Sequence, residues 1–119
     1  MSPELDIKDF ARNWIEAWNS HNLDGIMSHY DDDVVLTSPV AATILNCPSG
    51  TVEGKVALRE YFKRGLEVYA NLNFELLDVM RGLSSIVICY RNQKGTTTAE
   101  FMELTASGKI IRVVANYSK

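Results

Sequence analysis

The stretch that decides the fold is SSIVICYRNQKGTTTAEFMELT, residues 84 to 105. It contains two strand-like runs, residues 84–91 and 96–105, which are joined only by the turn-like tetrapeptide NQKG. Strands with so short a connection must lie antiparallel, because a parallel crossover needs about a dozen residues or more. The stretch therefore predicts two neighbouring antiparallel strands.

The same pattern continues on both sides of this pair. Residues 72–81 and 109–117 also read as strands, and their connections, RGL and ASGK, are equally short and turn-like. The sequence therefore predicts four consecutive antiparallel strands in its second half.

The first half of the chain has mainly helical periodicity. A helix is predicted over residues 2–20, with Ser2 as its cap and Pro3 at its first position. Its apolar side chains recur at the spacing of one helical face: Ile7, Phe10, Ala11, Trp14, Ile15 and Trp18. A second, shorter helix is predicted from Ser20 or Asn22 through Tyr30, and a third over about residues 54–70.

Two segments between these helices lack helical periodicity. VVLTS, residues 34–38, reads as a short strand that Pro39 ends, and the three aspartates at 31–33 read as a turn. Residues 40–53 show weak periodicity and predict an irregular loop, which is either a lid or part of a subunit interface. The predicted order is α-α-β-α-β-β-β-β, which indicates one α+β domain over residues 1–119 with helices on one face of a curved sheet.

Composition excludes several classes of protein. The chain has 119 residues, of which 46% are hydrophobic and 23% charged, as in ordinary globular domains. A net charge of −3 disfavours binding to nucleic acid or to an anionic membrane. MSPELDIKDF has no signal-peptide pattern, and no apolar run approaches the roughly 20 residues that span a bilayer. We therefore expect a cytoplasmic location and two free thiols, Cys47 and Cys89.

No pattern in the sequence predicts a metal site or a cofactor. Asp31, Asp32 and Asp33 are consecutive, so their side chains splay apart, and no EF-hand spacing follows them. His21 and His29 belong to no His–His or His–carboxylate motif of the kind that holds zinc. We interpret both histidines as surface or helix-end residues.

The order of elements, together with particular residues, resembles the SnoaL-like and ketosteroid-isomerase-like branch of the nuclear-transport-factor-2-like superfamily. The stretches that carry the resemblance are WNSHNLDGIMSHYDDDVVLTSP, GKVALREYFKRGL and GKIIRVVANYS. The resemblance implies a cystatin-like cone, in which a strongly bent antiparallel sheet packs on three helices and stays open at one end. It also implies a small apolar molecule as partner, bound inside the cone, and a homodimer formed through the sheet.

The resemblance also shows where this chain departs from the ketosteroid isomerases. Their catalytic base is an aspartate just before a proline at the end of the first strand, and here that position is Ser38. Serine is no base at neutral pH without an activating partner. The tyrosine of their oxyanion hole falls on Trp14, whose indole donates a hydrogen bond but cannot exchange a proton. We therefore predict no steroid double-bond isomerisation at an enzyme-like rate.

The acid of that oxyanion hole falls on Glu100, the predicted catalytic residue of this chain. On a period of two, Glu100 shares a strand face with Thr98, Met102 and Leu104. If that face lines the cone, burial raises the pKa of Glu100 and makes it a hydrogen-bond donor. The alternative is an exposed glutamate, or one paired with Arg112 on the next strand.

The remaining predicted site residues are ligand contacts from several elements: Trp14, Trp18, Tyr30, Ser38, Phe62 and Tyr117. For the tryptophans and Tyr30 the alternative is core packing, and for Ser38 it is a hydroxyl that closes a turn. Two hypotheses for the protein stay open. One is a small-molecule pocket, with or without isomerase, cyclase or hydrolase activity on an apolar carbonyl compound. The other is a non-catalytic dimerisation or ligand-binding module.

Overall fold

The computed structural model describes residues 6–118. In chain order, its elements are α1 (Ile7–Asn19), α2 (Leu23–Met27), β1 (Tyr30–Thr37), α3 (Pro39–Ile44), β2 (Thr51–Glu53), α4 (Lys55–Val68), β3 (Glu75–Arg81), β4 (Ser85–Arg91), β5 (Thr97–Leu104) and β6 (Ile110–Tyr117). The predicted α+β class and the order of the predicted elements are confirmed, and α3 and β2 are additional.

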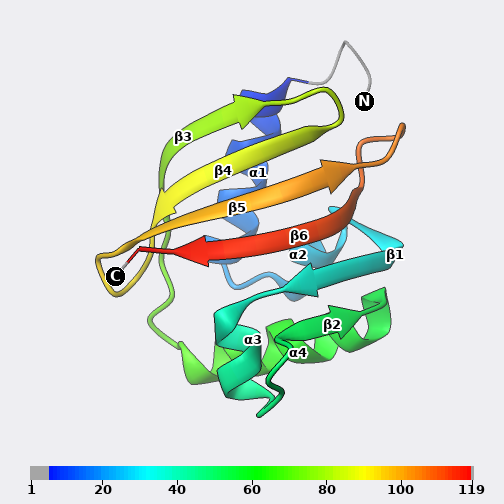
Figure 1. Ribbon diagram of the computed structural model, residues 1–119. Helices are drawn as coiled ribbons and strands as arrows, with labels where there is room; N and C mark the ends of the chain where they lie inside the picture. Colours follow the sequence, from blue (N-terminus) through cyan, green and yellow to red (C-terminus); the bar gives the residue numbers. More distant parts are fainter. Residues whose placement is uncertain (1–5, 119) are drawn as a thin grey trace.

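All six strands of the described chain form one sheet, in the order β2-β1-β6-β5-β4-β3. The pairs β3–β4, β4–β5 and β5–β6 are antiparallel, which confirms the predicted run of four strands. β1 lies parallel to β6, so the sheet is mixed and not wholly antiparallel as predicted. In Figure 1 the strands curve, with α1 behind β3, β4 and β5 and with α3 and α4 beneath β1.

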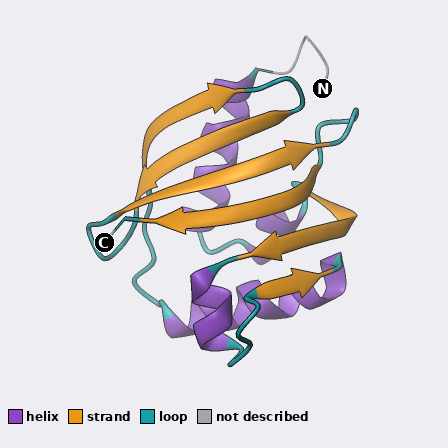
Figure 2. Ribbon diagram, viewed as in Figure 1, coloured by secondary structure: helices purple, strands orange, loops and turns teal. Residues whose placement is uncertain are grey.

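The helices cover one side of this sheet and enclose the core. Figure 2 shows the helices gathered behind and below the strands, where α1 contacts β3 and α4 contacts β1. The inner layer is aromatic. The rings of Phe74 and Tyr90 lie 4.2 Å apart, those of Trp18 and Phe62 4.7 Å apart, and those of Trp14 and Tyr90 5.6 Å apart.

The first helix begins later than predicted. Asp6 caps α1, because its side chain accepts hydrogen bonds from the backbone N–H groups of Lys8 and Asp9 at 2.9 and 3.2 Å. The predicted cap at Ser2 and the predicted role of Pro3 lie outside the described residues. The predicted apolar face is largely confirmed, since all its residues are buried except the half-buried Ile7.

Two predictions around the first strand are wrong. Tyr30 was predicted to end a helix and residues 31–33 to form a turn, but all belong to β1. The parallel register runs from Tyr30 opposite Ile110 to Val35 opposite Arg112, so β1 carries extra residues that bulge from the ladder. Polar aspartates at an exposed bulge give the same sequence signal as a turn, because both leave backbone groups unpaired in water.

The prediction of an irregular loop over residues 40–53 is also wrong, because this segment contains most of α3 and all of β2. The Ser38 hydroxyl caps α3 by accepting a hydrogen bond from the Val40 N–H at 3.1 Å, and Pro39 occupies the first helical position. β2 then pairs with β1, where Thr51 lies opposite Thr37. A six-residue helix is too short to show a clear period.

Within residues 6–118 there is no helix of the length and apolar character needed to cross a membrane.

Candidate functional site

A cavity of about 420 Å³ opens between the sheet and the helices. It is bounded by the inward face of β4, β5 and β6, by α3 and α4, and by the turn between β4 and β5. Its volume lies within the range of about 300–1,000 Å³ that is typical of small-molecule sites. Most of its walls are aromatic or aliphatic side chains.

Glu100 lines this cavity from the middle of β5. Its side chain is only 8% exposed, and Thr98, Met102 and Leu104 on the same strand face are fully or nearly buried. The predicted face is therefore the inward one. The alternative pairing with Arg112 is wrong, because the Arg112 guanidinium instead contacts the Glu103 carboxylate, with Nη1 and Oε1 3.0 Å apart.

The surroundings of Glu100 favour its neutral form. Among the described residues, the Tyr90 hydroxyl alone hydrogen-bonds the Glu100 side chain, donating to Oε2. Burial raises the pKa of Glu100 to about 7, and the Tyr90 hydrogen bond opposes this rise. Since Tyr90 donates to Oε2, Oε1 is the oxygen that can carry the proton of the neutral carboxyl. A group with such a pKa takes up and releases protons near neutral pH.

Tyrosine phenols surround this carboxyl. The negative charge of Glu100 contributes to a raised pKa at each of four tyrosines, after burial as the larger cause: Tyr30, Tyr61, Tyr90 and Tyr117. All four therefore stay protonated at neutral pH and act only as neutral hydrogen-bonding groups. At Tyr61 and Tyr117 a hydrogen-bonding interaction with the Ser38 side chain opposes the rise in pKa.

Tyr61 and Tyr90 were not predicted as site residues. The signal for Tyr90 was present in the same periodicity that placed Glu100. Ile88 lies opposite Glu100 and Tyr90 opposite Thr98, so Tyr90 is the diagonal neighbour of Glu100 on the inward face. The signal for Tyr61 was weaker, because it depends on how α4 is rotated against the sheet.

The predicted ligand contacts separate into two groups. Five of the predicted site residues line the cavity: Trp18, Ser38, Phe62, Glu100 and Tyr117. Trp14 and Tyr30 do not line it, but form a buried pair in which the Trp14 indole donates a hydrogen bond to the Tyr30 hydroxyl at 3.1 Å. This pair supports the wall from behind.

Trp18 differs from Trp14 in having a free donor. Its indole Nε1 is buried and has no hydrogen-bond partner among residues 6–118. An unpaired buried donor loses its hydration without replacement, which costs about 1–3 kcal/mol. An interaction of the Trp18 side chain with the Tyr30 hydroxyl opposes the rise in the pKa of Tyr30, so the indole N–H lies toward Tyr30, outside the cavity lining.

Ser38 has no partner of the kind that would activate it. Its hydroxyl caps α3, and among the described residues of the lining Glu100 is the sole carboxylate and there is no histidine. The described part of the chain also contains no group of three or more His, Cys, Asp or Glu side chains placed to hold a metal ion. Within the described lining, Glu100 is therefore the group whose pKa lies near neutral pH.

Comparisons with solved structures agree with this architecture. A SnoaL-like protein of unknown function from Burkholderia thailandensis is 34% identical, with a TM-score of 0.89 over 94% of this chain and 93% of the other. A candidate polyketide cyclase from Sinorhizobium meliloti has a TM-score of 0.75 at 14% identity, over 98% and 99% of the two chains. TerC, co-crystallised with polyporic acid, has a TM-score of 0.74 at 16% identity, over 95% and 92%.

The last two likenesses show the fold alone, because their identities are low. No curated protein matches this sequence. The profile of the SnoaL-like domain, however, matches residues 11–113, which run from within α1 to the middle of β6. This chain belongs to the SnoaL-like domain family.

Proposed function

We propose that this SnoaL-like domain binds a small, largely apolar molecule that carries a carbonyl group, and that Glu100 is the acid that faces this group. The observation that carries the proposal is a buried carboxyl at the wall of an apolar cavity, held by Tyr90 through one oxygen. A neutral carboxyl donates a hydrogen bond to a carbonyl oxygen, whereas a carboxylate would repel it.

The same arrangement suits a reaction in which negative charge develops on that oxygen, such as enolisation or ring closure. A donor that is already in place stabilises such charge without reorganising. Since burial raises the pKa of Glu100 to about 7, this residue can return a proton as well as donate a hydrogen bond. The names of two fold relatives, a candidate polyketide cyclase and a protein crystallised with polyporic acid, support a ring-bearing ligand. We propose no reaction through a base at Ser38.

Prodan, a fluorescent naphthyl ketone, tests this proposal because its emission reports the polarity and hydrogen bonding around its carbonyl. We expect it to bind more tightly as the pH falls from about 8 to about 6, with a midpoint near the pKa of Glu100. Glu100→Gln should abolish this pH dependence, because an amide donates at every pH. Glu103→Gln is the matched control on the outer face and should leave the dependence intact. If prodan did not bind, or if its binding to Glu100→Gln kept the same pH dependence, the proposal would be wrong.

A second proposal concerns the outer face of the sheet, which we propose forms a homodimer interface. The strand register places four apolar residues in one row across β3, β4, β5 and β6: Met80, Val87, Phe101 and Val114. Met80 is 51% exposed, and the other three are half-buried. An apolar row of this kind on a water-facing sheet is typical of an interaction surface.

Native mass spectrometry of the gently purified protein tests the dimer. We expect a dimer for the unaltered chain and a monomer for Phe101→Lys, with circular dichroism to show that the variant is folded. A monomeric unaltered chain at micromolar concentration would contradict this second proposal without affecting the first.

A further inference from the structure

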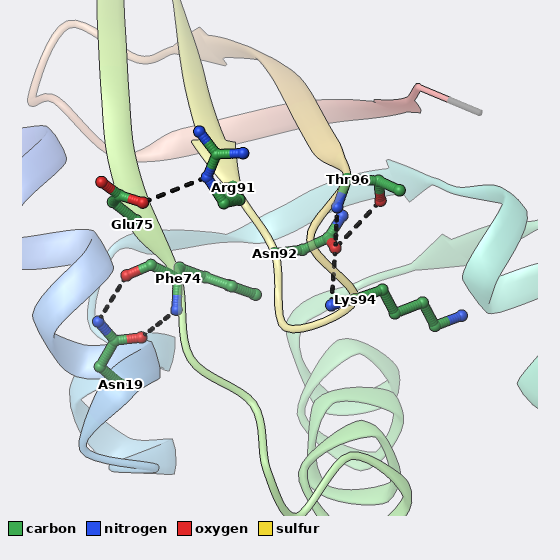
Figure 3. Close-up of polar contacts among 7 residues, drawn as sticks. All are labelled: Asn19, Phe74, Glu75, Arg91, Asn92, Lys94 and Thr96. Atoms are coloured by element: carbon green, nitrogen blue, oxygen red, sulfur yellow. Dashed lines mark hydrogen bonds and ion pairs between the residues drawn. The ribbon is translucent and has the colours of Figure 1, made fainter.

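The turn between β4 and β5 forms part of the cavity mouth and is held rigid by one buried side chain. The carboxamide oxygen of Asn92 accepts hydrogen bonds from the N–H of Lys94 at 3.0 Å and from the N–H and hydroxyl of Thr96 at 3.3 and 3.1 Å. Its Nδ2 donates to the Thr98 hydroxyl at 2.9 Å. Figure 3 shows Asn92 at the centre of this turn, with the Lys94 side chain extending away from it. Asn92 therefore fixes the position from which Lys94 reaches out.

Lys94 is the single basic residue among the described residues of the cavity lining. Its ammonium lies 5.4 Å from the centre of the Tyr69 ring, at the end of α4, so its side chain crosses the mouth between turn and helix. Within residues 6–118 it forms no ion pair, which is true of the other described lysines as well, but it is the lysine that lines the cavity. In a chain of net charge −3, an unpaired cation at a cavity mouth is available to a ligand.

Two further lining groups have unmet hydrogen-bonding capacity. The side-chain amide oxygen of Gln93, which follows Asn92 and precedes Lys94 in the same turn, is buried and has no partner within the described chain. The Trp18 indole N–H is likewise buried and unpartnered there, and Trp18 is 8% exposed. Buried polar groups are nearly always satisfied in folded proteins, so such groups in a cavity wall indicate what a ligand supplies. The Trp18 indole lies toward the Tyr30 hydroxyl, so the Gln93 side-chain oxygen is the clearer indication, and it requires a donor such as a hydroxyl.

From these observations we propose that the ligand is an apolar acid with two polar ends. Its uncharged carbonyl lies inside, against Glu100, and its acidic group lies at the mouth, against the Lys94 ammonium, with a neighbouring hydroxyl that donates to the Gln93 side-chain oxygen. This inference rests on the proposed function and adds the charge and the orientation of the ligand.

The orientation follows from the placement of charge. An anionic group inside the cavity would lose its hydration and would face the Glu100 carboxyl, which is repulsive when that group is ionised. At the mouth the anion keeps part of its hydration and gains the Lys94 ammonium. Because the Asn92 hydrogen bonds already hold the turn, binding costs little further backbone freedom. A carboxylic acid or an acidic enol fits this end.

A matched pair of fluorescent probes tests the inference. Anilinonaphthalene sulfonate and its uncharged parent, N-phenylnaphthylamine, have the same ring skeleton and differ by one anionic group. We expect Lys94→Met to weaken sulfonate binding by roughly three- to ten-fold, the range of a partly screened ion pair, and to leave the parent unchanged. Lys94→Arg keeps the charge and should retain tight sulfonate binding. Added salt should reduce the difference between the unaltered chain and Lys94→Met.

The outcomes separate the inference from the function on which it rests. If N-phenylnaphthylamine does not bind, the apolar cavity is closed to ligands and the proposed function fails. If the parent binds but Lys94→Met does not weaken the sulfonate, the inference is overturned while the proposed function stands. Excess parent should displace the sulfonate, because both occupy one cavity. Failure to displace it would place the sulfonate on another surface and would also overturn the inference.

Discussion

Glu100 and Glu103 lie three positions apart on β5 and have opposite surroundings. Glu100 is on the inward face, 8% exposed and hydrogen-bonded by a tyrosine, and its pKa is raised to about 7 by burial. Glu103 is on the outward face, where its carboxylate forms an ion pair with Arg112 at 3.0 Å in water. The strand and the residue type are the same, so the difference in surroundings comes from the side of the sheet on which each side chain lies.

This contrast shows what the fold contributes to the chemistry of the site. A strand alternates its side chains, so a sheet that is covered on one side gives each strand a dry face and a wet face. A glutamate on the wet face is an ordinary solubilising charge. On the dry face, beside a cavity, the same carboxyl keeps its proton to higher pH and becomes a donor for a ligand.

The largest expected effect is on the pH dependence of stability. Between pH 4.5 and about 7 the folded chain keeps the Glu100 proton that the unfolded chain has released. Glu100 should therefore lower the free energy of unfolding by about 3 kcal/mol in total as the pH rises through this range, whereas His29, whose pKa is lowered by burial, contributes in the opposite direction below pH 6.5. Urea denaturation should show that Glu100→Gln loses this dependence and that Glu103→Gln keeps it. If the free energy of unfolding depended on pH in the same way in all three proteins, the contrast between Glu100 and Glu103 would be wrong.

A smaller effect is expected from Tyr90→Phe, which removes the hydroxyl that donates to Glu100. Because this hydrogen bond lowers the pKa of Glu100, its loss should move the midpoint of prodan binding to higher pH. The stability cost should be about 2 kcal/mol at pH 8, where the carboxylate is ionised, and about 1 kcal/mol at pH 5. A cost that is equal at both pH values, or a midpoint that moves down, would contradict the role given to Tyr90.

The smallest effect is expected on the wet face. In the monomer, a double-mutant cycle with Glu103→Gln and Arg112→Gln should give a coupling free energy below about 1 kcal/mol, because both side chains are about half exposed there. Added salt should reduce it further. A coupling of several kcal/mol that resists salt would show that the outward face is as dry as the inward one.

Much of this contrast was predictable from the sequence. The short turns predicted the antiparallel order of β3 to β6, and the period of two placed Glu100 with Thr98, Met102 and Leu104. Both signals are local, because they depend on neighbouring residues in the chain. The resemblance to the SnoaL-like family then predicted that the inward face borders a cavity.

The rest depends on contacts between distant parts of the chain. The parallel pairing of β1 with β6 joins residues about eighty positions apart in the chain, and no local sequence pattern predicts it. The place of Lys94 above Tyr69 depends on where the hairpin tip meets the end of α4. Trp14 and Trp18 lie one turn apart on the same face of α1, so which of them reaches the cavity depends on where the cavity begins along the helix axis.

The most direct test of the central claim is a titration of the Glu100 carboxyl by carbon NMR, with side-chain-labelled glutamate and Glu100→Gln for assignment. We predict an inflection near pH 7 for Glu100 in the folded, ligand-free chain. An inflection near 4.5, the ordinary value for glutamate, would mean that Glu100 is hydrated and ionised at neutral pH. In that case it would not be the acid that faces a carbonyl, and the proposed function would be wrong.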